Sequence, residues 1–282
     1  MPNAGLRRIG LLYNPRLPQS RVMAAEMLEF VEGAGVSGWV GDTWDEATVA
    51  PRIADTDLLI TLGGDGSILR AAHMALRHNT LIMGVNLGTL GFLAEIEPAE
   101  WPQRFQQLMR GEYRVEERLM VQAQCHRGNR LLNHCHALNE VVISRGGVAR
   151  VVRLATHINQ SYLTTYTADG MILSTPTGST AYALAAGGPI LPPELQNFLL
   201  IPLAPHLSLE RAIVLSKGDV VRLVISTDHP AILTVDGHYD LALDDGDVVE
   251  VSASPYTSRF LRLKDRTHFY TTLMQRLGRP HV

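Results

Sequence analysis

The chain has 282 residues, of which 46% are hydrophobic and 19% charged, a composition typical of a folded globular protein and wrong for a disordered one. Its formal net charge is −3 and it contains no tract of Lys and Arg, so we expect no nucleic-acid partner. No apolar run approaches the roughly 18 residues of a membrane span, and the first residues lack the apolar core of a signal peptide. We expect a cytoplasmic protein with no membrane partner.

Strands and helices alternate over residues 1–110. The predicted strands are 9–13, 39–40, 58–62 and 81–85. The predicted helices are 20–31, 43–53 (a short helix or a loop), 68–76 and 101–109. Because strands that alternate with helices form parallel sheets covered by helices, we expect an α/β N-terminal domain with a Rossmann-like sheet.

The pattern changes near Gly111, and short strands separated by turns continue to about residue 263. The predicted strands are 115–125, 130–137, 141–144, 151–158, 162–166, 172–174, 220–225, 232–235 and 248–252. One helix is predicted at 179–186 and a terminal helix at 269–277. We therefore expect a mainly β C-terminal domain over 111–263, built as sandwich-like packed sheets.

Two cysteines lie on either side of a predicted two-residue hairpin turn at Gly128-Asn129. This turn would place Cys125 opposite Leu132 rather than opposite Cys135. We therefore expect two buried thiols in a reducing compartment and no disulfide.

The loop 63–66, Gly-Gly-Asp-Gly, follows the apolar strand 58–62 and precedes a helix, with Ser67 as a possible N-cap. Glycines let the backbone approach a ligand, and a helix N-terminus offers N–H groups and partial positive charge, so this arrangement suits phosphate. Because a carboxylate repels phosphate, Asp65 indicates chemistry or metal binding as well. The alternative is a tight turn with a helix-capping Asp.

A second glycine-rich stretch, residues 84–93, also follows a strand but lacks the dinucleotide signature. Asn86 stands in place of the first glycine of GxGxxG, and no acidic residue ends a following strand to bind ribose. A dehydrogenase-type site is therefore poorly supported. The sequence GxxxxGK[ST] does not occur, which excludes a P-loop kinase on motif grounds.

Two further segments place polar residues at the ends of apolar strands. Asn139-Glu140 interrupts an apolar strand, and a buried carboxylate must be satisfied, either by backbone at a bulge or by a substrate. Residues 169–182 run from a strand into a hydroxyl-rich loop and a helix start near Ser179, which suits ribose, adenine or phosphate. Asp236-Gly237 fits an ordinary hairpin turn.

Together, residues 63–66, 139–140 and 175–182, in this order and spacing, resemble the NAD kinase family. The likeness runs from about residue 8 to residue 265, and it includes further matches at 84–93, 187–189 and 235–237. The Gly-Gly-Asp-Gly element alone is shared with lipid kinases and phosphofructokinases. The Asn-Glu and Thr-Gly-Ser-Thr-Ala-Tyr elements select the NAD kinases among them.

The resemblance implies transfer of the γ-phosphoryl group of ATP to the 2′-hydroxyl of the adenosine ribose of NAD, giving NADP and ADP. It implies ATP and NAD as substrates, with Mg²⁺ or another divalent cation, and a homodimer or homotetramer. It also implies that the tail, residues 264–282, packs back on the domain of residues 1–110. No residue is assigned as a metal ligand, and no structural zinc is expected because no Cys/His cluster has ligand spacing.

The resemblance assigns a role to each matching residue. Asp65 is expected beside the attacking hydroxyl, where it accepts the proton or orients the hydroxyl while Mg²⁺ does the electrostatic work. The residues expected to receive ATP phosphates are Gly63, Gly64, Gly66 and Ser67. The residues expected to bind NAD are Asn86, Phe92, Asn139, Glu140, Asp169, Thr177, Thr180, Ala181, Tyr182, Ala185 and Asp236. Within this set, Ala185 stands where several relatives carry Ser, so one hydrogen bond to the dinucleotide is missing.

The expected contacts within this NAD-binding set differ. Asn139 and Glu140 are expected to hold the ribose hydroxyls, and residues 180–182 the adenine side. Asp169 is expected to serve the site of a neighbouring subunit. Asp236 either contacts the ligand or shapes its own turn.

Two other functions are alternatives. A kinase for another hydroxyl, in a lipid or a sugar, accounts for the Gly-Gly-Asp-Gly loop but leaves Asn139-Glu140 and residues 177–182 unexplained. A non-catalytic NAD(P)-binding sensor requires a lost or blocked catalytic carboxylate, and Asp65 is present.

Overall fold

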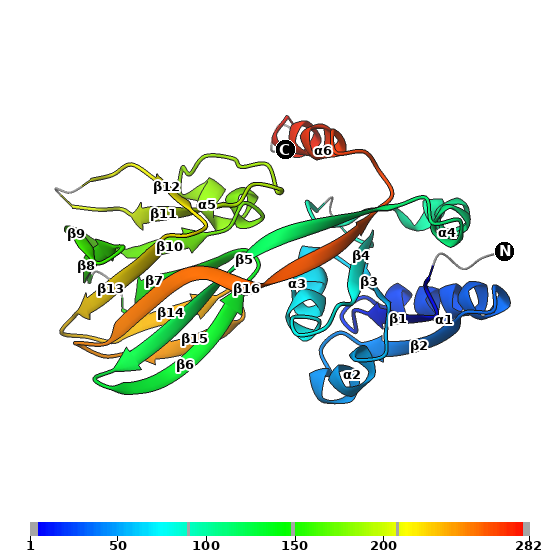
Figure 1. Ribbon diagram of the computed structural model, residues 1–282, viewed down its shortest axis with the longest axis horizontal. Helices are drawn as coiled ribbons and strands as arrows, with labels where there is room; N and C mark the ends of the chain where they lie inside the picture. The colour runs from blue at the N-terminus through cyan, green and yellow to red at the C-terminus, as the bar shows by residue number, and fades with distance from the viewer. Residues whose placement is uncertain (1–4, 89–90, 148–149, 207–208, 279–282) are drawn as a thin grey trace. The chain divides into compact units, whose positions relative to one another are not determined.

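The computed structural model describes residues 5–88, 91–147, 150–206 and 209–278, and it divides into two units (Figure 1). Unit 1 comprises Met1–Glu117 and Ser258–Val282, and unit 2 comprises Arg118–Thr257. Unit 1 is therefore made of two separate segments, with the whole of unit 2 between them in the sequence. Among the described residues, no helix is both long and apolar enough to span a membrane.

Unit 1 is built on a parallel sheet with the strand order β2-β1-β3-β4. Its strands are β1 (Arg8–Tyr13), β2 (Ser37–Asp42), β3 (Leu58–Gly63) and β4 (Leu81–Asn86). Every residue of β3 and β4 is buried, which is why both read as continuous apolar runs rather than as an alternating pattern. Gly63 and Asn86 are register partners at the carboxyl ends of these strands, so the two glycine-rich stretches start side by side.

Helices connect and follow the strands of unit 1. They are α1 (Pro18–Gly33), α2 (Glu46–Ile53), α3 (Asp65–Met74), α4 (Trp101–Met109), preceded by the 3₁₀ helix η1 (Pro98–Glu100), and α6 (His268–Leu277). In α1, Pro18 occupies the first turn, where its missing N–H has no intrahelical partner to lose. The Asp45 side chain accepts the N–H of Thr48 and caps α2, so the segment predicted as a helix or a loop is a helix from Glu46.

The prediction that Ser67 is the N-cap of the third helix is wrong. Helix α3 begins two residues earlier, at Asp65, with Gly64 as its N-cap in an extended conformation. Ser67 lies in the first turn with only 2% of its surface exposed. Gly63 makes this close packing possible, because a Cβ at that position would collide with the Ser67 hydroxyl.

A buried charge cluster fixes the chain that leads into α6. Arg262 pairs with Glu95 (Nη1–Oε2 3.0 Å) and with Glu116 (Nε–Oε1 3.1 Å), and all three side chains are at most 6% exposed. The other oxygen of Glu95 accepts the backbone N–H groups of Leu263 (2.8 Å) and Lys264 (2.7 Å). Because unpairing any of these charges would leave another buried and uncompensated, the cluster holds the C-terminal segment firmly in unit 1.

Unit 2 is a sandwich of two sheets. One has the order β12-β11-β10-β7-β14-β15, and the other includes β16, β13, β8 and β9, with β5 beside β16 and β6 beside β5. The strands of the first are β7 (Glu140–Arg145), β10 (Gly170–Ser174), β11 (Asn197–Leu203), β12 (Ile213–Ser216), β14 (Ala231–Val235) and β15 (Tyr239–Leu243). Those of the second are β5 (Arg114–Arg127), β6 (Arg130–Ala137), β8 (Val152–Ile158), β9 (Ser161–Ala168), β13 (Val220–Ser226) and β16 (Val248–Arg262).

The core of unit 2 lies between these sheets. Ile143 and Leu173 from the first pack in one cluster with Leu154, Leu223 and Val251 from the second, and all five are fully buried. This confirms the predicted β-rich sandwich, as the parallel sheet of unit 1 confirms the predicted α/β fold.

Several element predictions need correction. Strands β11, β12 and β15 were not expected, and β16 continues ten residues past the predicted end at 252, to Arg262. The single helix predicted at 179–186 is instead the 3₁₀ helix η2 (Gly178–Thr180) followed by the short α5 (Tyr182–Ala185). In Figure 1, β16 is the long orange strand beside β5.

The predicted register of the cysteine hairpin is also wrong by one residue. Gly128-Asn129 does form the turn, with Arg127 opposite Arg130, but a bulge between Cys125 and His126 places Cys125 opposite Asn133. Both cysteines are free, and burial raises the pKa of each thiol to about 11. Cys125 is buried and Cys135 is partly exposed.

Candidate active site

The carboxylate of Asp65 is held by the second glycine-rich stretch. The backbone N–H of Phe92 donates to Oδ2 (2.9 Å), and that of Leu93 donates to Oδ1 (3.0 Å). A Cβ on Gly91 would collide with the same carboxyl group, so glycine is needed there. The two glycine-rich stretches therefore make one site, in which one presents the carboxylate and the other orients it.

The loop beside Asp65 leaves space for an anion. An added Cβ at Gly64 or at Gly66 would meet no atom within 4 Å among the described residues. In the same part of the chain, no side chain caps the first turn of α3. The Ser67 N–H bonds to the carbonyl of Gly64 (3.0 Å), so the N–H groups of Asp65 and Gly66 remain available to a ligand. Ser67 points the other way, and its buried Oγ accepts a hydrogen bond from Nδ2 of Asn14 (3.3 Å).

Asn86 lies next to this loop but its amide is already engaged. It is 5% exposed, its Nδ2 donates to Oε1 of Glu97 (2.9 Å), and its Oδ1 accepts the N–H of Gly88 (3.2 Å). These contacts shape the start of the second glycine-rich stretch. The expected contact of Asn86 with NAD stays a prediction.

One residue of this site had no signal in the sequence. Arg276, in the last turn of α6, has its Nη1 4.0 Å from Oδ2 of Asp65. Its guanidinium lies over the ring of Phe92, with Cζ 4.5 Å from the ring centroid. A single arginine on the polar face of a terminal helix looks like an ordinary solvated charge, and only the folded chain brings it to Asp65.

In unit 2, Asp236 organises the Asn139-Glu140 turn. Its buried carboxylate accepts the backbone N–H groups of Leu138 (2.8 Å), Asn139 (2.8 Å) and Glu140 (3.0 Å). Asp236 has a φ of +46° and the following Gly237 one of +70°, so a tight turn aims this carboxylate at the neighbouring strand. The residue shapes the predicted ribose-binding turn as well as its own.

Replacing Asp236 is expected to destabilise unit 2. Asp236→Ala leaves buried N–H groups without an acceptor, and we expect it to lower the free energy of unfolding by about 3 kcal/mol. Asp240→Ala on the same hairpin is the matched control, because it removes one exposed bond to Thr234 (2.7 Å). Urea unfolding of both variants checks this. Equal losses of stability in the two would contradict a special role for Asp236.

Glu140 is a buried carboxyl that lacks a full set of partners. It is 7% exposed, and its Oε2 accepts no hydrogen bond from the described residues. Burial, and then the charge of Asp236, raise its pKa to about 8, although a hydrogen bond from the backbone N–H of Tyr182 acts in the opposite direction. A ligand hydroxyl could donate the hydrogen bond that this buried oxygen lacks.

The hydroxyl-rich turn after β10 is largely explained by its internal hydrogen bonds. The hydroxyl of Thr175 donates to the carbonyl of Leu138 and accepts the N–H of Gly178. Ser179 is fully buried, donates to the carbonyl of Pro176 (2.7 Å) and accepts the N–H of Leu191 (3.0 Å). The Thr175 bond ties the turn to the segment that leads into Asn139-Glu140, and the Ser179 bonds hold the turn itself, so neither hydroxyl is presented to a ligand.

The remaining predicted residues of this turn differ in exposure. Thr177 is buried and its Oγ1 lies 3.4 Å from Nη1 of Arg118. Thr180 and Ala181 are partly exposed, Tyr182 has 46% of its surface exposed, and Ala185 is exposed. Surface for a ligand is therefore available at residues 180–182 and at Ala185.

Asp169 does not lie beside the Asn139-Glu140 turn and the hydroxyl-rich turn. In the register of β10 with β7, Ser174 pairs with Glu140 at one end, whereas Asp169 precedes Gly170 at the other. Its carboxylate makes an ion pair with Arg145 (Nε–Oδ1 3.1 Å). Within a single chain, the strand separates Asp169 from the Asn139-Glu140 turn.

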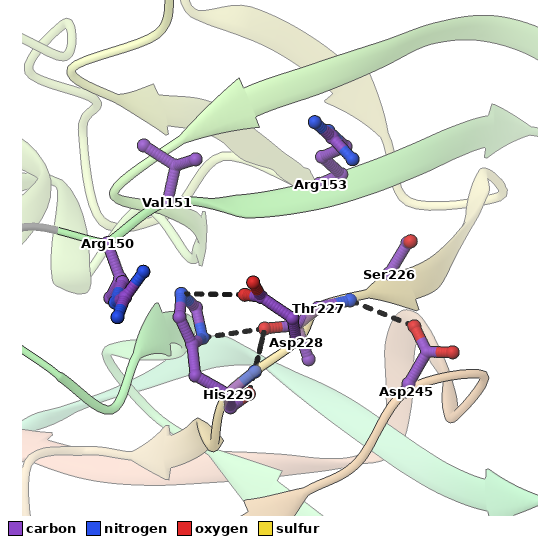
Figure 2. A pocket seen from close by; sticks show the side chains of 8 residues that line it. All are labelled: Arg150, Val151, Arg153, Ser226, Thr227, Asp228, His229 and Asp245. Atoms are coloured by element: carbon purple, nitrogen blue, oxygen red, sulfur yellow. Dashed lines mark hydrogen bonds and ion pairs between the residues drawn. The ribbon is translucent and has the colours of Figure 1, made fainter.

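A cavity of about 440 Å³ in unit 2 is lined by none of the predicted site residues (Figure 2). Its lining residues are Arg150, Val151, Arg153, Ser226, Thr227, Asp228, His229 and Asp245. Thr227 bonds to both His229 (Oγ1–Nδ1 2.7 Å) and Asp245 (N–Oδ1 2.9 Å). The cavity has mixed charge, and among the described residues its bonds join only Thr227, Asp228, His229 and Asp245 to one another.

The expected divalent cation can be tested against the residues present. Among the described residues, no three His, Cys, Asp or Glu side chains cluster so as to hold a metal ion. Asp65, however, accepts one N–H on each oxygen and keeps lone pairs on both. Because protein-bound Mg²⁺ commonly uses one or two carboxylates together with substrate phosphates, a single Asp beside a phosphate loop fits such an ion.

Comparison with known proteins gives a consistent result. The family described as ATP-NAD kinase N-terminal domain matches residues 9–113, and its C-terminal domain matches residues 138–263. An NAD kinase of Chloroflexus aurantiacus is 43% identical over 274 residues, covering 97% of this chain and 99% of the relative. An NAD kinase of Moorella thermoacetica is 38% identical, covering 96% and 89% respectively.

Solved structures agree in fold. A yeast NADH kinase complexed with NADH superposes with a TM-score of 0.86 at 27% identity, over 98% of this chain and 89% of that one. An NAD kinase from Archaeoglobus fulgidus in complex with ATP gives a TM-score of 0.78 over 97% of this chain and 100% of that one. At 23% identity, this second likeness shows the fold alone.

Proposed function

We propose that Asp65 and its phosphate loop perform the phosphoryl transfer and that the Asn139-Glu140 turn binds the acceptor. The chain belongs to the ATP-NAD kinase family. The enzyme is an NAD kinase, which transfers the γ-phosphoryl group of ATP to the 2′-hydroxyl of the adenosine ribose of NAD. The observation that carries the residue assignment is the Asp65 carboxylate, fixed by two backbone N–H groups beside an uncapped helix N-terminus.

In the proposed step, the ribose 2′-oxygen forms a bond to the γ-phosphorus and the bond from that phosphorus to the bridging oxygen of ADP breaks. ADP leaves with the bond's electron pair, and the hydroxyl proton passes to Asp65 and then to water. The hydrogen bonds from Phe92 and Leu93 aim the carboxylate before the substrate arrives. Such positioning of a general base is worth about a hundred- to ten-thousandfold in rate.

The phosphates of ATP are proposed to lie against Gly63, Gly64 and Gly66, where N–H groups of the first turn of α3 face the anion. A divalent cation, when bound, supplies further positive charge to the phosphates, and Asp65 is the residue that would hold it. Ser67 contributes by packing under Gly63, since its hydroxyl is buried.

The ribose of NAD is proposed to engage Asn139 and Glu140. A ribose hydroxyl that donates to Oε2 of Glu140 would give that oxygen the partner it lacks among the described residues. Because the ionised carboxylate is the better acceptor, binding favours loss of the Glu140 proton. The exposed surface at Tyr182 and Ala185 is proposed to hold the adenine side.

Other properties are proposed by family resemblance. We infer a homodimer or homotetramer in which Asp169 serves a neighbouring subunit, and a cytoplasmic location. We also keep the predicted domains, residues 1–110 completed by 264–282, and residues 111–263. The net charge of −3 supports the absence of a nucleic-acid partner.

A donor–acceptor assay tests the proposed function. The purified protein is incubated with ATP or polyphosphate and with NAD, NADH, diacylglycerol or fructose 6-phosphate, and both ADP and phosphorylated product are measured. We expect NADP from ATP and NAD. Phosphorylation of the lipid or sugar in place of NAD would favour the other kinase class, and NADP binding without turnover in any pair would favour a sensor.

A further inference from the structure

We propose that Arg276 of the C-terminal helix binds the transferred phosphoryl group and neutralises its charge next to Asp65. The inference deepens the proposed function and rests on it. Its basis is a juxtaposition within unit 1: Nη1 of Arg276 lies 4.0 Å from Oδ2 of Asp65, although 210 residues separate the two in sequence.

The geometry holds the guanidinium in place without using its donors. A separation of 4.0 Å exceeds hydrogen-bond length, and the side chain of Arg276 makes no hydrogen bond within the described ranges, which end at residue 278. The guanidinium lies over the Phe92 ring, with Cζ 4.5 Å from the ring centroid, a cation–π contact that uses none of its N–H donors. The same Phe92 also donates its backbone N–H to Asp65, so one residue sets the positions of both charged groups.

The site needs a cation close to Asp65. ATP and Asp65 bring negative charge together, and kinases commonly neutralise it with a lysine or arginine as well as a metal ion. The chain contains only two lysines, Lys217 and Lys264, and Lys264 pairs with Glu100 at 3.5 Å. An arginine with a rigid, multidentate fork is well suited to the task.

Two other arginines of unit 1 also lie over an aromatic ring, but among the described residues neither makes an ion pair with Asp65. Arg16 follows β1 and Arg70 lies in α3, and both guanidiniums stack on Trp44, at 5.1 Å and 4.8 Å from its ring centroid. Arg276 is the cation paired with Asp65 itself. In the balanced step, it would contact the non-bridging oxygens of the phosphoryl group as the bond to ADP breaks and the bond to the ribose oxygen forms.

The alternative is a surface ion pair that only anchors α6. The two side chains are 35% and 30% exposed, and exposed pairs at this separation contribute little to stability. A structural pair predicts a small stability loss with unchanged chemistry. A phosphoryl-binding group predicts the opposite pattern.

Three variants test the proposal: Arg276→Ala, Arg276→Lys and the control Gln275→Ala, an exposed neighbour on the same helix. We measure kcat, the KM for ATP, NAD affinity by calorimetry and the melting temperature. For Arg276→Ala we expect kcat to fall about 100-fold with NAD affinity within about twofold of the parent chain. Arg276→Lys should keep an intermediate kcat, and the control should match the parent.

Chemical rescue gives a second readout. Millimolar guanidinium chloride should restore part of the kcat of Arg276→Ala and should not raise that of the parent chain or of Arg276→Lys. An unchanged kcat in Arg276→Ala overturns the proposal. A fall in kcat without rescue, matched by lost NAD affinity or a lowered melting temperature, also overturns it. If the parent chain itself forms no NADP, the proposed function fails instead.

Discussion

Asp65→Asn is expected to lower kcat for NADP formation by about a thousandfold, because it removes the proton acceptor without removing the side chain. The amide oxygen can still accept one of the two backbone N–H groups that hold the carboxylate, from Phe92 and Leu93. The fold and the affinity for NAD should therefore persist. Fixed-time assays of NADP formation measure the fall in kcat, and calorimetry of NAD binding measures the affinity separately.

Asp45→Asn is the matched control for this substitution. Asp45 caps α2 through the N–H of Thr48, and asparagine is an equally good N-cap, so neither stability nor kcat should change. Normal turnover by Asp65→Asn would contradict the role of Asp65 as the proton acceptor. So would a collapse of the fold that accounts for the whole loss of activity.

Glu140→Gln is expected to stabilise the free protein at alkaline pH. The pKa of Glu140 is raised from 4.5 to about 8, so the folded state holds a proton that the unfolded state releases. That contribution is fully present below about pH 4.5 and is lost as the pH rises to about 8. Between pH 5.5 and pH 9, the parent chain should lose about 3 kcal/mol from this group, and the Gln variant should not.

The same substitution should weaken NAD binding. The proposed ribose contact needs the carboxylate, so parent affinity should rise with pH to about 8, whereas Glu140→Gln should bind about tenfold more weakly and without this pH dependence. Calorimetry in buffers of different ionisation enthalpy detects the released proton. Glu250→Gln, which alters a half-exposed pair with Arg222, is the control. A variant that keeps both the affinity and its pH dependence would contradict the assignment.

Local pattern was sufficient for much of the fold. The buried strands β3 and β4 show as apolar runs, and α4 has the bounds predicted from its helical spacing, 101–109. Strand β11 escaped detection although it is nearly all apolar, because Pro202 argues against a central strand. Strand β15 is largely exposed, so it lacks the apolar alternation that marks a strand.

The residues of the candidate active site could be predicted only where their function depends on the side chain. The Gly-Gly-Asp-Gly loop and Asn139-Glu140 could be read directly. The support of Asp65 by backbone N–H groups of residues 92 and 93 could not, because a backbone donor has no sequence signature. Asp236 was read as a turn residue, since its three acceptor contacts lie about a hundred residues away in the chain.

The interrupted order of unit 1 has a consequence for biosynthesis. The ribosome makes the loop of Asp65 early, then all of unit 2, and only afterwards the end of β16 and helix α6. Since nascent domains tend to fold from the N-terminus onward, strands β1 to β4 are free to associate while their last partner is still unmade. If Arg276 acts as proposed, a chain truncated just before it is a folded but nearly inactive kinase, and catalytic competence waits until helix α6 has been made.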